Sequence, residues 1–449
     1  MSYISDVIAM TEANNPGQSE FMQTVREVLE SLQPAIEKNE DLYRSHAILE
    51  RMVEPDRQIM FRVVWEDDNG KTHVNRGYRI QFNNAIGPYK GGIRFHPSVN
   101  LSVMKFLAFE QTFKNSLTSL PMGGAKGGAD FNPIGKSDSE IFRFCQSFMM
   151  ELYRHIGPNM DVPAGDIGVG AKEVGYMFGV YKKIRGDYEN GVLTGKGLSF
   201  GGSLIRPEAT GFGSVYFLNE ILKHQGDTIK GKTFAISGFG NVAWGSCKKI
   251  TELGGKVLTI SGPDGYIYDP DGVSGEKIDY LLEMRNSKNQ RTQDYSDKFG
   301  VQFFPGKKPW GNVKADIYMP CACQNEINLD DAKRTVELGC VKYLNEVSNM
   351  PTSNEALAYF KEHGIIVAPS KASNAGGVAT SGLEMSQNSA RLSWSREQVD
   401  TTLKEIMKNI HNQIVEALNE YGLGYDLVAG ANLAGFKKVA DAMIAQGRI

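Results

Sequence analysis

A glycine-rich turn between a strand pattern and a helix pattern constrains the fold of this chain more than any other feature. Residues 232–237 form a short β-type run, Gly238-Phe239-Gly240 follows, residues 241–253 have helical spacing, and residues 256–261 again form a β-type run. Two strands joined by one helix lie parallel in the same sheet. The sequence therefore predicts an α/β chain with a doubly wound, Rossmann-type domain that begins near residue 202.

The turn itself predicts a site for a dinucleotide. In Gly238-x-Gly240-x-x-Ala243 the first glycine allows a tight turn, the second lets the backbone approach a pyrophosphate, and the helix start presents free N–H groups to the anion. The alternative is a tight turn with a structural role alone. The cofactor contacts expected here are Gly238, Phe239, Gly240, Asn241 and Val242.

The loop after the second strand bears on the choice between NAD and NADP. Its sequence is Ser261-Gly262-Pro263-Asp264-Gly265, and it contains neither Arg nor Lys. A carboxylate near the adenosine ribose accepts a hydrogen bond from the 2′-hydroxyl and repels a 2′-phosphate. Asp264, with Ser261 and Pro263 beside it, therefore favours NAD, and NADP stays possible. The alternative is that Pro263-Asp264-Gly265 is simply a β-turn.

The rest of the chain has a mixed helix and strand pattern. The expected elements are helical residues 20–52 interrupted at Pro34, strands at 58–65 and 73–81 joined by a turn at 67–70, helices over 100–119 and from 137, a strand at 315–319, and a last long helix capped by Ser395-x-x-Gln398. Ser137-x-x-Glu140 is a capping-box sequence. The apolar residues that follow it repeat at three and four, so this helix is expected to cover a core.

The composition excludes several classes of protein. The 449 residues carry a net charge of −3, which predicts no general attraction to nucleic acid or to an anionic membrane. No apolar run approaches the roughly 18 residues of a membrane span, and the N-terminus lacks the apolar segment of a secretion signal. The five cysteines form no C-x-x-C pair, which favours free thiols in a reducing compartment. We expect a cytoplasmic protein without a metal site.

Three lysines have surroundings that suggest a site for a small anion. Lys90 precedes Gly91-Gly92, and Lys126 has glycines on both sides within residues 121–128. Such glycines allow close approach of a ligand to the backbone. Lys114 follows Gln111 by three residues on a largely apolar helix, so the two share a face. Together the lysines predict a site for a multiply anionic molecule such as a dicarboxylate; ordinary solvated lysines are the alternative.

Asp166 is a candidate proton carrier. It lies in a loop bounded by Gly and Pro, over residues 161–168. A carboxylate near several ammonium groups stays ionised unless burial raises its pKa, and it could then transfer a proton. The alternative is an aspartate that caps a turn or a helix.

Several motifs resemble hexameric glutamate dehydrogenases of the short bacterial type, over nearly the whole chain. They are Pro88-Tyr89-Lys90-Gly91-Gly92, residues 105–114, residues 120–128, residues 161–170, residues 206–211 and residues 369–377. The resemblance implies the reversible oxidative deamination of L-glutamate to 2-oxoglutarate and ammonia, with hydride transfer to a nicotinamide dinucleotide. The loop from Ser261 and the residue Phe239 resemble the NAD-preferring clostridial branch. Cys323 and Ser348 depart from the usual Thr and Ala on the expected cofactor side.

The resemblance also implies roles for individual residues. Lys126 is similar to the lysine that activates the attacking water with a lowered pKa, and Asp166 to the aspartate that relays protons to and from the amino group. The implied substrate contacts are Lys114 and Gln111 at the α-carboxylate, Lys90 and Ser381 at the side-chain carboxylate, and Gly165, Arg206, Asn374 and Val378 around them. Thr210 and Asn349 are further cofactor contacts. A second cation in place of an apolar pocket separates glutamate from leucine or phenylalanine as substrate.

The family resemblance further implies the organisation of the chain. It implies a substrate-binding and oligomerisation domain over residues 1–201, a dinucleotide-binding domain over residues 202–424, and a C-terminal segment over residues 425–449 that packs on the first domain. The expected partners are glutamate, 2-oxoglutarate, ammonium and other copies of the chain in a homohexamer, with neither nucleic acid nor membrane.

Three alternative functions differ from this one. The first is the same fold acting on another amino acid. The second is a catalytically silent dinucleotide sensor, which would lack Lys126 or Asp166, whereas both are present. The third is a nucleic-acid-binding protein, which the net charge of −3 disfavours.

Overall fold

The chain divides into two compact units. The computed structural model describes residues 2–287 and 291–449. The first unit contains the chain up to Leu204 together with Ser381–Arg396 and Asn432–Ile449, and the second contains Ile205–Thr380 and Glu397–Ala431.

This division differs from the expected domains in one segment. Residues 381–396, expected in the dinucleotide-binding domain, belong to the first unit. The reason is a set of hydrogen bonds that sequence spacing does not reveal: Glu384 accepts one from the backbone N–H of Gly195, and Gln387 donates one to Ser203. The boundary after Leu204 and the C-terminal return from Asn432 lie a few residues beyond the expected positions.

The first unit is built on a five-stranded sheet in the order β1-β2-β4-β3-β5. Its strands are β1 (Arg57–Glu66), β2 (Thr72–Asn83), β3 (Tyr89–Phe95), β4 (Gly124–Ala129) and β5 (Asp161–Gly165). β1, β2 and β4 are antiparallel in turn, whereas β3 runs parallel to both β4 and β5. The predicted hairpin turn is confirmed, because the Gly70 N–H donates to the Asp67 carbonyl and Gly70 has a φ of +79°.

The helices of this unit are α1 (Tyr3–Asn14), α2 (Ser19–Ser31), α3 (Gln33–Ser45), α4 (Ile48–Val53), α5 (Leu101–Leu117), α6 (Asp138–Leu152) and α7 (Ala171–Arg185), with short 3₁₀ turns at Tyr153–His155, Asn190–Val192 and Leu198–Phe200. Of these helices, α5 packs on β4 and β2, and α6 packs on β1. Pro34 interrupts the N-terminal helical pattern as expected, but it also lies in the first turn of α3. Proline is tolerated there because the first turn has no intrahelical partner for an N–H.

The predicted capping box and apolar stripe of α6 are confirmed. Ser137 Oγ accepts from the Glu140 N–H, and Glu140 accepts from the Ser137 N–H. The stripe, from Ile141 to Leu152, is buried against the sheet, where the Phe144 and Phe131 rings stack with centroids 3.8 Å apart. This core fixes the underside of the strands that carry the candidate site.

The second unit is built on a seven-stranded sheet in the order β12-β11-β10-β6-β7-β8-β9. Its strands are β6 (Thr233–Ile236), β7 (Lys256–Gly262), β8 (Gly265–Tyr268), β9 (Gln302–Pro305), β10 (Ile317–Met319), β11 (Tyr343–Asn345) and β12 (Ile366–Ala368). β12, β11, β10, β6 and β7 are parallel, and β8 and β9 add an antiparallel edge. The predicted strand–helix–strand unit is confirmed as β6, α9 and β7, and with it the Rossmann-type fold class.

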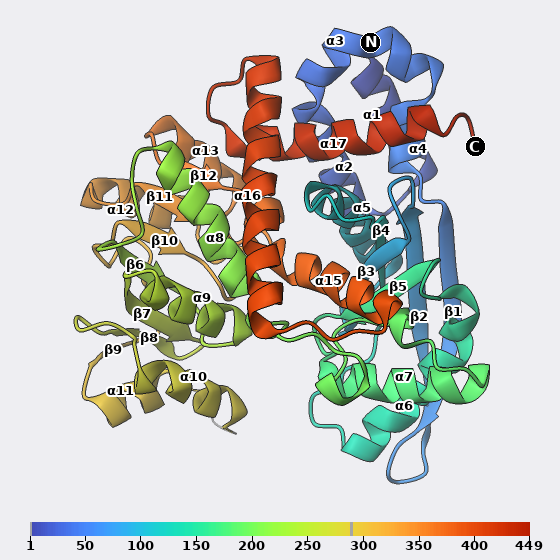
Figure 1. Ribbon diagram of the computed structural model, residues 1–449, viewed down its shortest axis with the longest axis horizontal. Coiled ribbons are helices and arrows are strands. Elements are labelled where there is room, and N and C mark those ends of the chain that lie inside the picture. The colour runs from blue at the N-terminus through green and yellow to red at the C-terminus, as the bar shows by residue number, and fades with distance from the viewer. Residues whose placement is uncertain (1, 288–290) are drawn as a thin grey trace. The chain divides into compact units, whose positions relative to one another are not determined.

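The helices of the second unit follow the alternation of strands. They are α8 (Ala209–His224), α9 (Asn241–Glu252), α10 (Glu276–Asn286), α11 (Gln293–Phe299), α12 (Leu329–Leu338), α13 (Asn354–Glu362), α14 (Ser370–Ser373) and α16 (Arg396–Tyr421) from Glu397 onward, while α15 (Gly376–Ala390) and α17 (Leu427–Ala445) are divided between the two units. α8 and α9 lie side by side (Figure 1). The close approach of α8 to α9 is possible because Gly211 faces the α9 backbone.

The order of strands reverses at β6. The chain continues from β6 to β7, β8 and β9 on one side and then returns to β10, β11 and β12 on the other. In sheets of this kind ligands bind outside the carboxyl ends of the strands at the reversal. That position is directly after Ile236 and Met319, at the Gly238 turn and Cys321.

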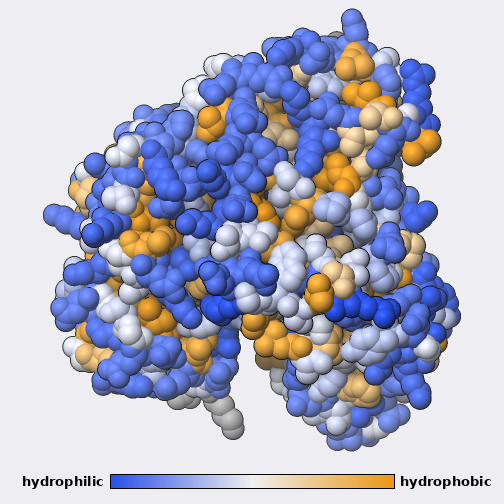
Figure 2. Space-filling model, viewed as in Figure 1, coloured by the Kyte–Doolittle hydropathy of each residue, from blue (hydrophilic) through white to orange (hydrophobic). Residues whose placement is uncertain are grey.

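Hydrophilic residues dominate the face drawn in Figure 2, with hydrophobic side chains in small separate groups. Among residues 2–287 and 291–449, no helix has the length and apolar character needed to cross a membrane. Within the same ranges, no group of three or more His, Cys, Asp or Glu side chains is arranged to hold a metal ion.

Candidate active site

Three adjacent strands of the first unit carry the candidate catalytic residues. Lys90 lies on β3, Lys126 on β4, and Asp166 directly follows β5. β3 is the central strand of the three, and its residue Ile93 pairs with Gly127 on one side and Gly165 on the other. The parallel register therefore brings Lys126 and Asp166, which lie beside Gly127 and Gly165, to the two sides of Ile93, while Lys90 lies three residues before Ile93 on the same strand.

Gly92 leaves the space in which the Lys126 and Asp166 side chains meet. A Cβ added at Gly92 would lie 2.8 Å from Asp166 Cβ, 3.0 Å from the Gly165 carbonyl oxygen and 3.4 Å from Lys126 Nζ. Any larger residue would displace the two side chains. Gly92 thus makes room for the neighbouring charged side chains, whereas Gly91 allows the close approach of the Ala125 backbone.

Asp166 is bound by two cations. Its Oδ1 lies 3.1 Å from Lys126 Nζ, and its Oδ2 accepts a hydrogen bond of 2.7 Å from Arg94 Nε. Burial alone would raise the pKa of the Asp166 carboxyl, but Lys126 and Arg94 more than offset this and lower the pKa to about 2. The carboxylate is therefore ionised in the free protein. The Asp166 backbone opens a turn, because its carbonyl accepts from the Val169 N–H at 2.9 Å, while its side chain binds the two cations.

Lys126 is nearly inaccessible to solvent. Its side chain is 7% exposed, and burial lowers the pKa of its ammonium group. The Asp166 carboxylate raises the pKa of Lys126 and the Arg94 guanidinium lowers it. The pKa of Lys126 is lowered overall. A lysine with a lowered pKa can lose and regain its proton during a reaction near neutral pH.

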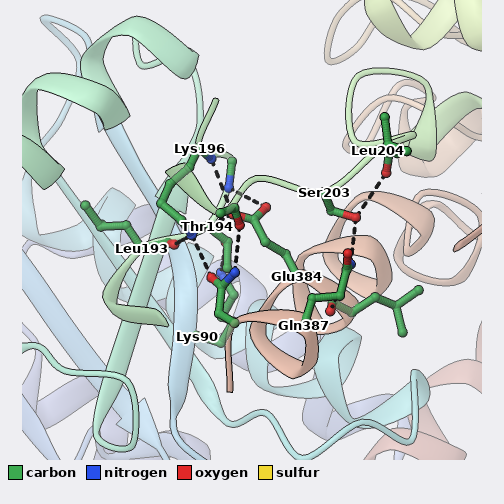
Figure 3. A network of polar contacts seen from close by, with 12 residues as sticks. Lys90, Leu193, Thr194, Lys196, Ser203, Leu204, Glu384 and Gln387 are labelled. Atoms are coloured by element: carbon green, nitrogen blue, oxygen red, sulfur yellow. Dashed lines mark hydrogen bonds and ion pairs between the residues drawn. The ribbon is translucent and has the colours of Figure 1, made fainter. Parts of the chain in front are cut away.

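Lys90 is a second buried cation, 1% exposed. Its Nζ donates a hydrogen bond of 2.8 Å to Thr194 Oγ1 (Figure 3). Its backbone carbonyl accepts from Asn115 Nδ2 on α5, and Asn115 in turn accepts from Gln111. The structure thus links Gln111 to the strand that carries Lys90, while Lys114 lies on the same helix and is partly exposed.

The remaining expected substrate residues are divided between the two units. Gly165 ends β5, and Ser381, 2% exposed, lies on the part of α15 that belongs to the first unit. Arg206, Asn374 and Val378 belong to the second unit. Within that unit a Cβ added at Gly377 would lie 2.6 Å from Thr210 Oγ1 and 3.8 Å from Arg206 Nη1, so these residues gather around the start of α15.

The glycine turn of the second unit has the geometry of an anion site. Gly238 has a φ of +81°, which favours glycine, and its N–H donates to Ser261 Oγ at 3.2 Å. A Cβ added at Gly240 would meet no described atom within 4 Å, so the turn is open where α9 begins at Asn241. Val242 in the first turn of α9 is partly exposed, and Ala243 is buried.

Asp264 lies in a tight hairpin, as the turn interpretation predicts. Gly262 pairs with Gly265 across the β7–β8 hairpin, so Pro263 and Asp264 are its two loop residues. The Asp264 carboxylate accepts from the backbone N–H groups of Thr292, at 2.9 Å, and Gln293, at 3.0 Å. Burial would raise the pKa of this carboxyl, but these backbone bonds lower it. A carboxylate has further lone pairs, so the same bonds leave room for a ribose hydroxyl.

Phe239 lies against the same hairpin. A Cβ added at Gly262 would be 2.8 Å from the Phe239 ring. The two expected coenzyme-specificity features, Phe239 and the loop from Ser261, are therefore in contact. Cys323 and Ser348, the two residues that depart from the family pattern, also contact each other, because Ser348 Oγ donates to the Cys323 carbonyl oxygen at 3.2 Å.

The carboxyl ends of β11 and β12 contribute an amide pair that fits a bound ligand. Asn374 Nδ2 donates to Asn349 Oδ1 at 2.9 Å. Among the described residues, the buried Oδ1 of Asn374 has no hydrogen-bond partner. Buried oxygens of this kind are uncommon because they lose their hydration without replacement, so this one suits a donor group on a ligand. With the open turn at Gly240, the residues present fit a dinucleotide.

Sequence reasoning missed three residues of these sites. Arg94 follows the glycines after Lys90, and its position four residues on from Lys90 on a strand could have indicated it. No feature of the sequence indicated Thr194. Glu326 accepts from Ser237 Oγ and from the backbone N–H groups of Ala322 and Cys323, and so supports the loop opposite the glycine turn; it too is visible only in the folded chain.

A Rossmann-type sheet with an open glycine turn, together with a buried lysine–aspartate site on a separate sheet, defines a dinucleotide-dependent oxidoreductase. Residues 201–447 match the family described as Glutamate/Leucine/Phenylalanine/Valine dehydrogenase, and residues 55–183 match the Glu/Leu/Phe/Val dehydrogenase dimerisation domain. The chain belongs to this Glutamate/Leucine/Phenylalanine/Valine dehydrogenase family.

Individual members of the family are similar over their whole length. The NAD-specific glutamate dehydrogenase of Clostridium symbiosum is 64% identical over 447 residues, covering 99% of each chain. The NAD(P)-specific glutamate dehydrogenase of Xylanibacter ruminicola is 56% identical over 443 residues, again covering 99% of each. A solved structure of a glutamate dehydrogenase superposes with a TM-score of 0.97 at 64% identity and 99% coverage of both chains.

Proposed function

We propose that this chain is a glutamate dehydrogenase that uses NAD. The observation that carries the proposal is the pair of separate buried cations on one sheet, Lys126 in contact with Asp166 and Lys90 in contact with Thr194. Lys126, together with Asp166, suits the α-carbon at which an amino acid reacts, and Lys90 suits a carboxylate on its side chain. The similarity to glutamate dehydrogenases over the whole chain supports the same substrate.

Lys126 and Asp166 are the catalytic residues in this proposal. Neutral Lys126 takes a proton from the water that attacks the imine carbon, and its ammonium form stabilises the oxygen that becomes negative. Asp166 receives and returns protons of the substrate amino group. Arg94 keeps the Asp166 carboxylate oriented. NAD, when bound, supplies the acceptor for the α-hydrogen as hydride.

The substrate is oriented by its two carboxylates. Lys114 and Gln111 bind the α-carboxylate beside the backbone of Gly165, and Lys90 with Ser381 binds the side-chain carboxylate. Arg206, Asn374 and Val378 of the second unit are assigned to the same substrate. Two fixed carboxylates place the α-carbon in one position, which supplies a large part of the rate through orientation.

The dinucleotide binds at the glycine turn of the second unit. Gly238 and Gly240, with Asn241 and Val242 at the start of α9, would hold the pyrophosphate, and Thr210 and Asn349 would be further contacts of the dinucleotide. Phe239, Ser261, Pro263 and Asp264 surround the adenosine ribose. The ionised Asp264 disfavours a 2′-phosphate, so NAD is preferred and NADP is used more weakly; relatives named as NAD-specific and as NAD(P)-specific support this order.

The enzyme is proposed to be a homohexamer of the cytoplasm. The match of residues 55–183 to a dimerisation domain supports self-association, as do the exposed Met60, Val64 and Val74 on β1 and β2. The five free thiols, three of them buried, support a reducing compartment. Its partners are glutamate, 2-oxoglutarate and ammonium. Mass measurement by light scattering on purified protein tests the oligomer.

Initial rates of NADH formation from L-glutamate test the function. We expect turnover with NAD, a lower kcat/KM with NADP, and the reverse reaction with 2-oxoglutarate and ammonium. Absence of glutamate turnover with both coenzymes, with faster turnover of leucine or phenylalanine, would assign the chain to another branch of the family.

A further inference from the structure

A buried ion pair lies next to Lys90 and is used by none of the proposed catalytic steps. Lys196 Nζ and Glu384 Oε1 are 2.7 Å apart, and both side chains are 0% exposed (Figure 3). Lys196 Nζ also donates to Asn388 Oδ1, at 2.8 Å, and to the Leu193 carbonyl oxygen. All three protons of the ammonium group thus have acceptors. A buried pair contributes little net stability compared with apolar residues, which raises the question of its role.

Glu384 holds the backbone of the loop as well as its lysine. Its Oε2 accepts from the Gly195 N–H at 2.9 Å, and its Oε1 accepts from the Lys196 N–H at 3.4 Å. With the bond from Lys196 Nζ to the Leu193 carbonyl, the ion pair is tied to residues 193, 195 and 196. The loop is therefore fixed on both sides of Thr194.

Thr194 is the residue that the loop presents to Lys90. It is 0% exposed, its N–H donates to the Pro163 carbonyl at 3.0 Å, and its Oγ1 accepts from Lys90 Nζ at 2.8 Å. A lysine side chain has four flexible bonds, so the position of its ammonium group depends on the acceptors around it. A shift of the loop would move this acceptor.

The same carboxylate also fixes the helix that carries Ser381. Glu384 follows Ser381 by three residues on α15, so the two side chains lie on one face of the helix. We propose that the Lys196–Glu384 pair is a positioning device that holds Thr194 and Ser381 in place around Lys90, and thereby selects substrates with a terminal carboxylate. This inference depends on the proposed function, and Lys196 and Glu384 are positioning residues, since neither is assigned to the reacting atoms.

Reductive amination of two keto acids tests the proposal. 2-Oxoglutarate and 2-oxopentanoate have the same number of carbons and differ in the terminal carboxylate. In Glu384→Gln we expect kcat/KM for 2-oxoglutarate to fall at least about tenfold, mainly through KM, and kcat/KM for 2-oxopentanoate to change less than about twofold. An equal fall for both keto acids would overturn the proposal, because a purely structural role affects both alike.

Two further variants separate positioning from stability. Ser203→Ala removes the hydrogen-bond partner of Gln387, which lies on the same face of α15, and keeps the contacts to the 193–196 loop. It should therefore leave the relative kcat/KM of the two keto acids unchanged. Lys196→Met with Glu384→Leu replaces the ion pair by apolar residues and should restore thermal stability without restoring the preference for 2-oxoglutarate. If Glu384→Gln does not fold, the double variant is used for the same measurement, the ratio of kcat/KM for 2-oxoglutarate to kcat/KM for 2-oxopentanoate. A ratio equal to that of the wild-type protein refutes the proposal. A wild-type protein that does not aminate 2-oxoglutarate refutes the proposed function instead.

Discussion

The Lys126 ammonium group lies 3.1 Å from the Asp166 carboxylate, and Arg94 binds the other carboxylate oxygen at 2.7 Å. Two cations therefore share one anion in a space that Gly92 leaves open. This net positive charge is suited to a developing negative oxygen, and it lowers the pKa of Asp166. The pKa of Lys126 is lowered by burial, with a smaller contribution from Arg94.

Replacing Lys126 should remove catalysis and spare the coenzyme. Lys126→Ala removes the group that takes the proton from water, so kcat for glutamate oxidation should fall at least about 10³-fold. The glycine turn belongs to the second unit, so the Kd of NAD, measured by fluorescence titration, should stay within about twofold of wild type. Retained turnover would refute the catalytic assignment.

Arg94 should set the pH dependence of the reaction. Arg94 lowers the pKa of Lys126, so in Arg94→Met that pKa rises. If neutral Lys126 is the active form, the rising limb of the kcat/KM profile for glutamate oxidation should move to higher pH. Arg76→Met, an exposed arginine on β2, is the matched control and should not move the limb. A shift to lower pH in Arg94→Met would contradict the account.

Lys90 should decide between glutamate and apolar amino acids. Lys90→Leu replaces a buried cation by an apolar side chain, so kcat/KM for L-glutamate should fall at least about 10²-fold, while the value for L-norvaline should stay level or rise. The measurement is the ratio of the two kcat/KM values. Unchanged glutamate kinetics would mean that the side-chain carboxylate binds elsewhere.

Glu346 should make the protein less stable as pH rises. It is 4% exposed, and burial raises the pKa of its carboxyl from 4.5 to about 7. The stability from this protonated group is complete below pH 4.5 and is lost as pH rises through 7, by at most about 3 kcal/mol. Glu346→Gln should therefore raise the melting temperature at pH 8 more than at pH 5. Glu362→Gln, an exposed carboxylate on α13, should show no such difference.

Local patterns in the sequence predicted several elements and the strand and helix on either side of the glycine turn. The β6–α9–β7 unit, the α6 capping box and the 67–70 turn depend on neighbouring residues, and all three are confirmed. The lysines among glycines pointed to an anion site, since Gly92 acts within a few residues of Lys90. Such features can be predicted from the sequence because they depend on residues that are close together in the chain.

The partners of these residues could not be read in the same way. Arg94 and Asp166 are 72 positions apart, and Lys196 and Glu384 are 188 apart. Their pairing follows from the parallel register of β3 and β5 and from the return of α15 to the first unit. Asp264 shows the same limit, because its bonds to residues 292 and 293 appear only after folding.

The central claim is that Lys90, a buried lysine of the first unit separate from Lys126 and Asp166, selects an amino acid with a second carboxylate. The most direct test is the kcat/KM of the wild-type protein with NAD for L-glutamate and for L-norvaline, which has the same five-carbon chain without the terminal carboxylate. We predict a value for glutamate at least about 10²-fold higher. Equal values, or a preference for norvaline, would contradict the assignment of Lys90 to the second carboxylate.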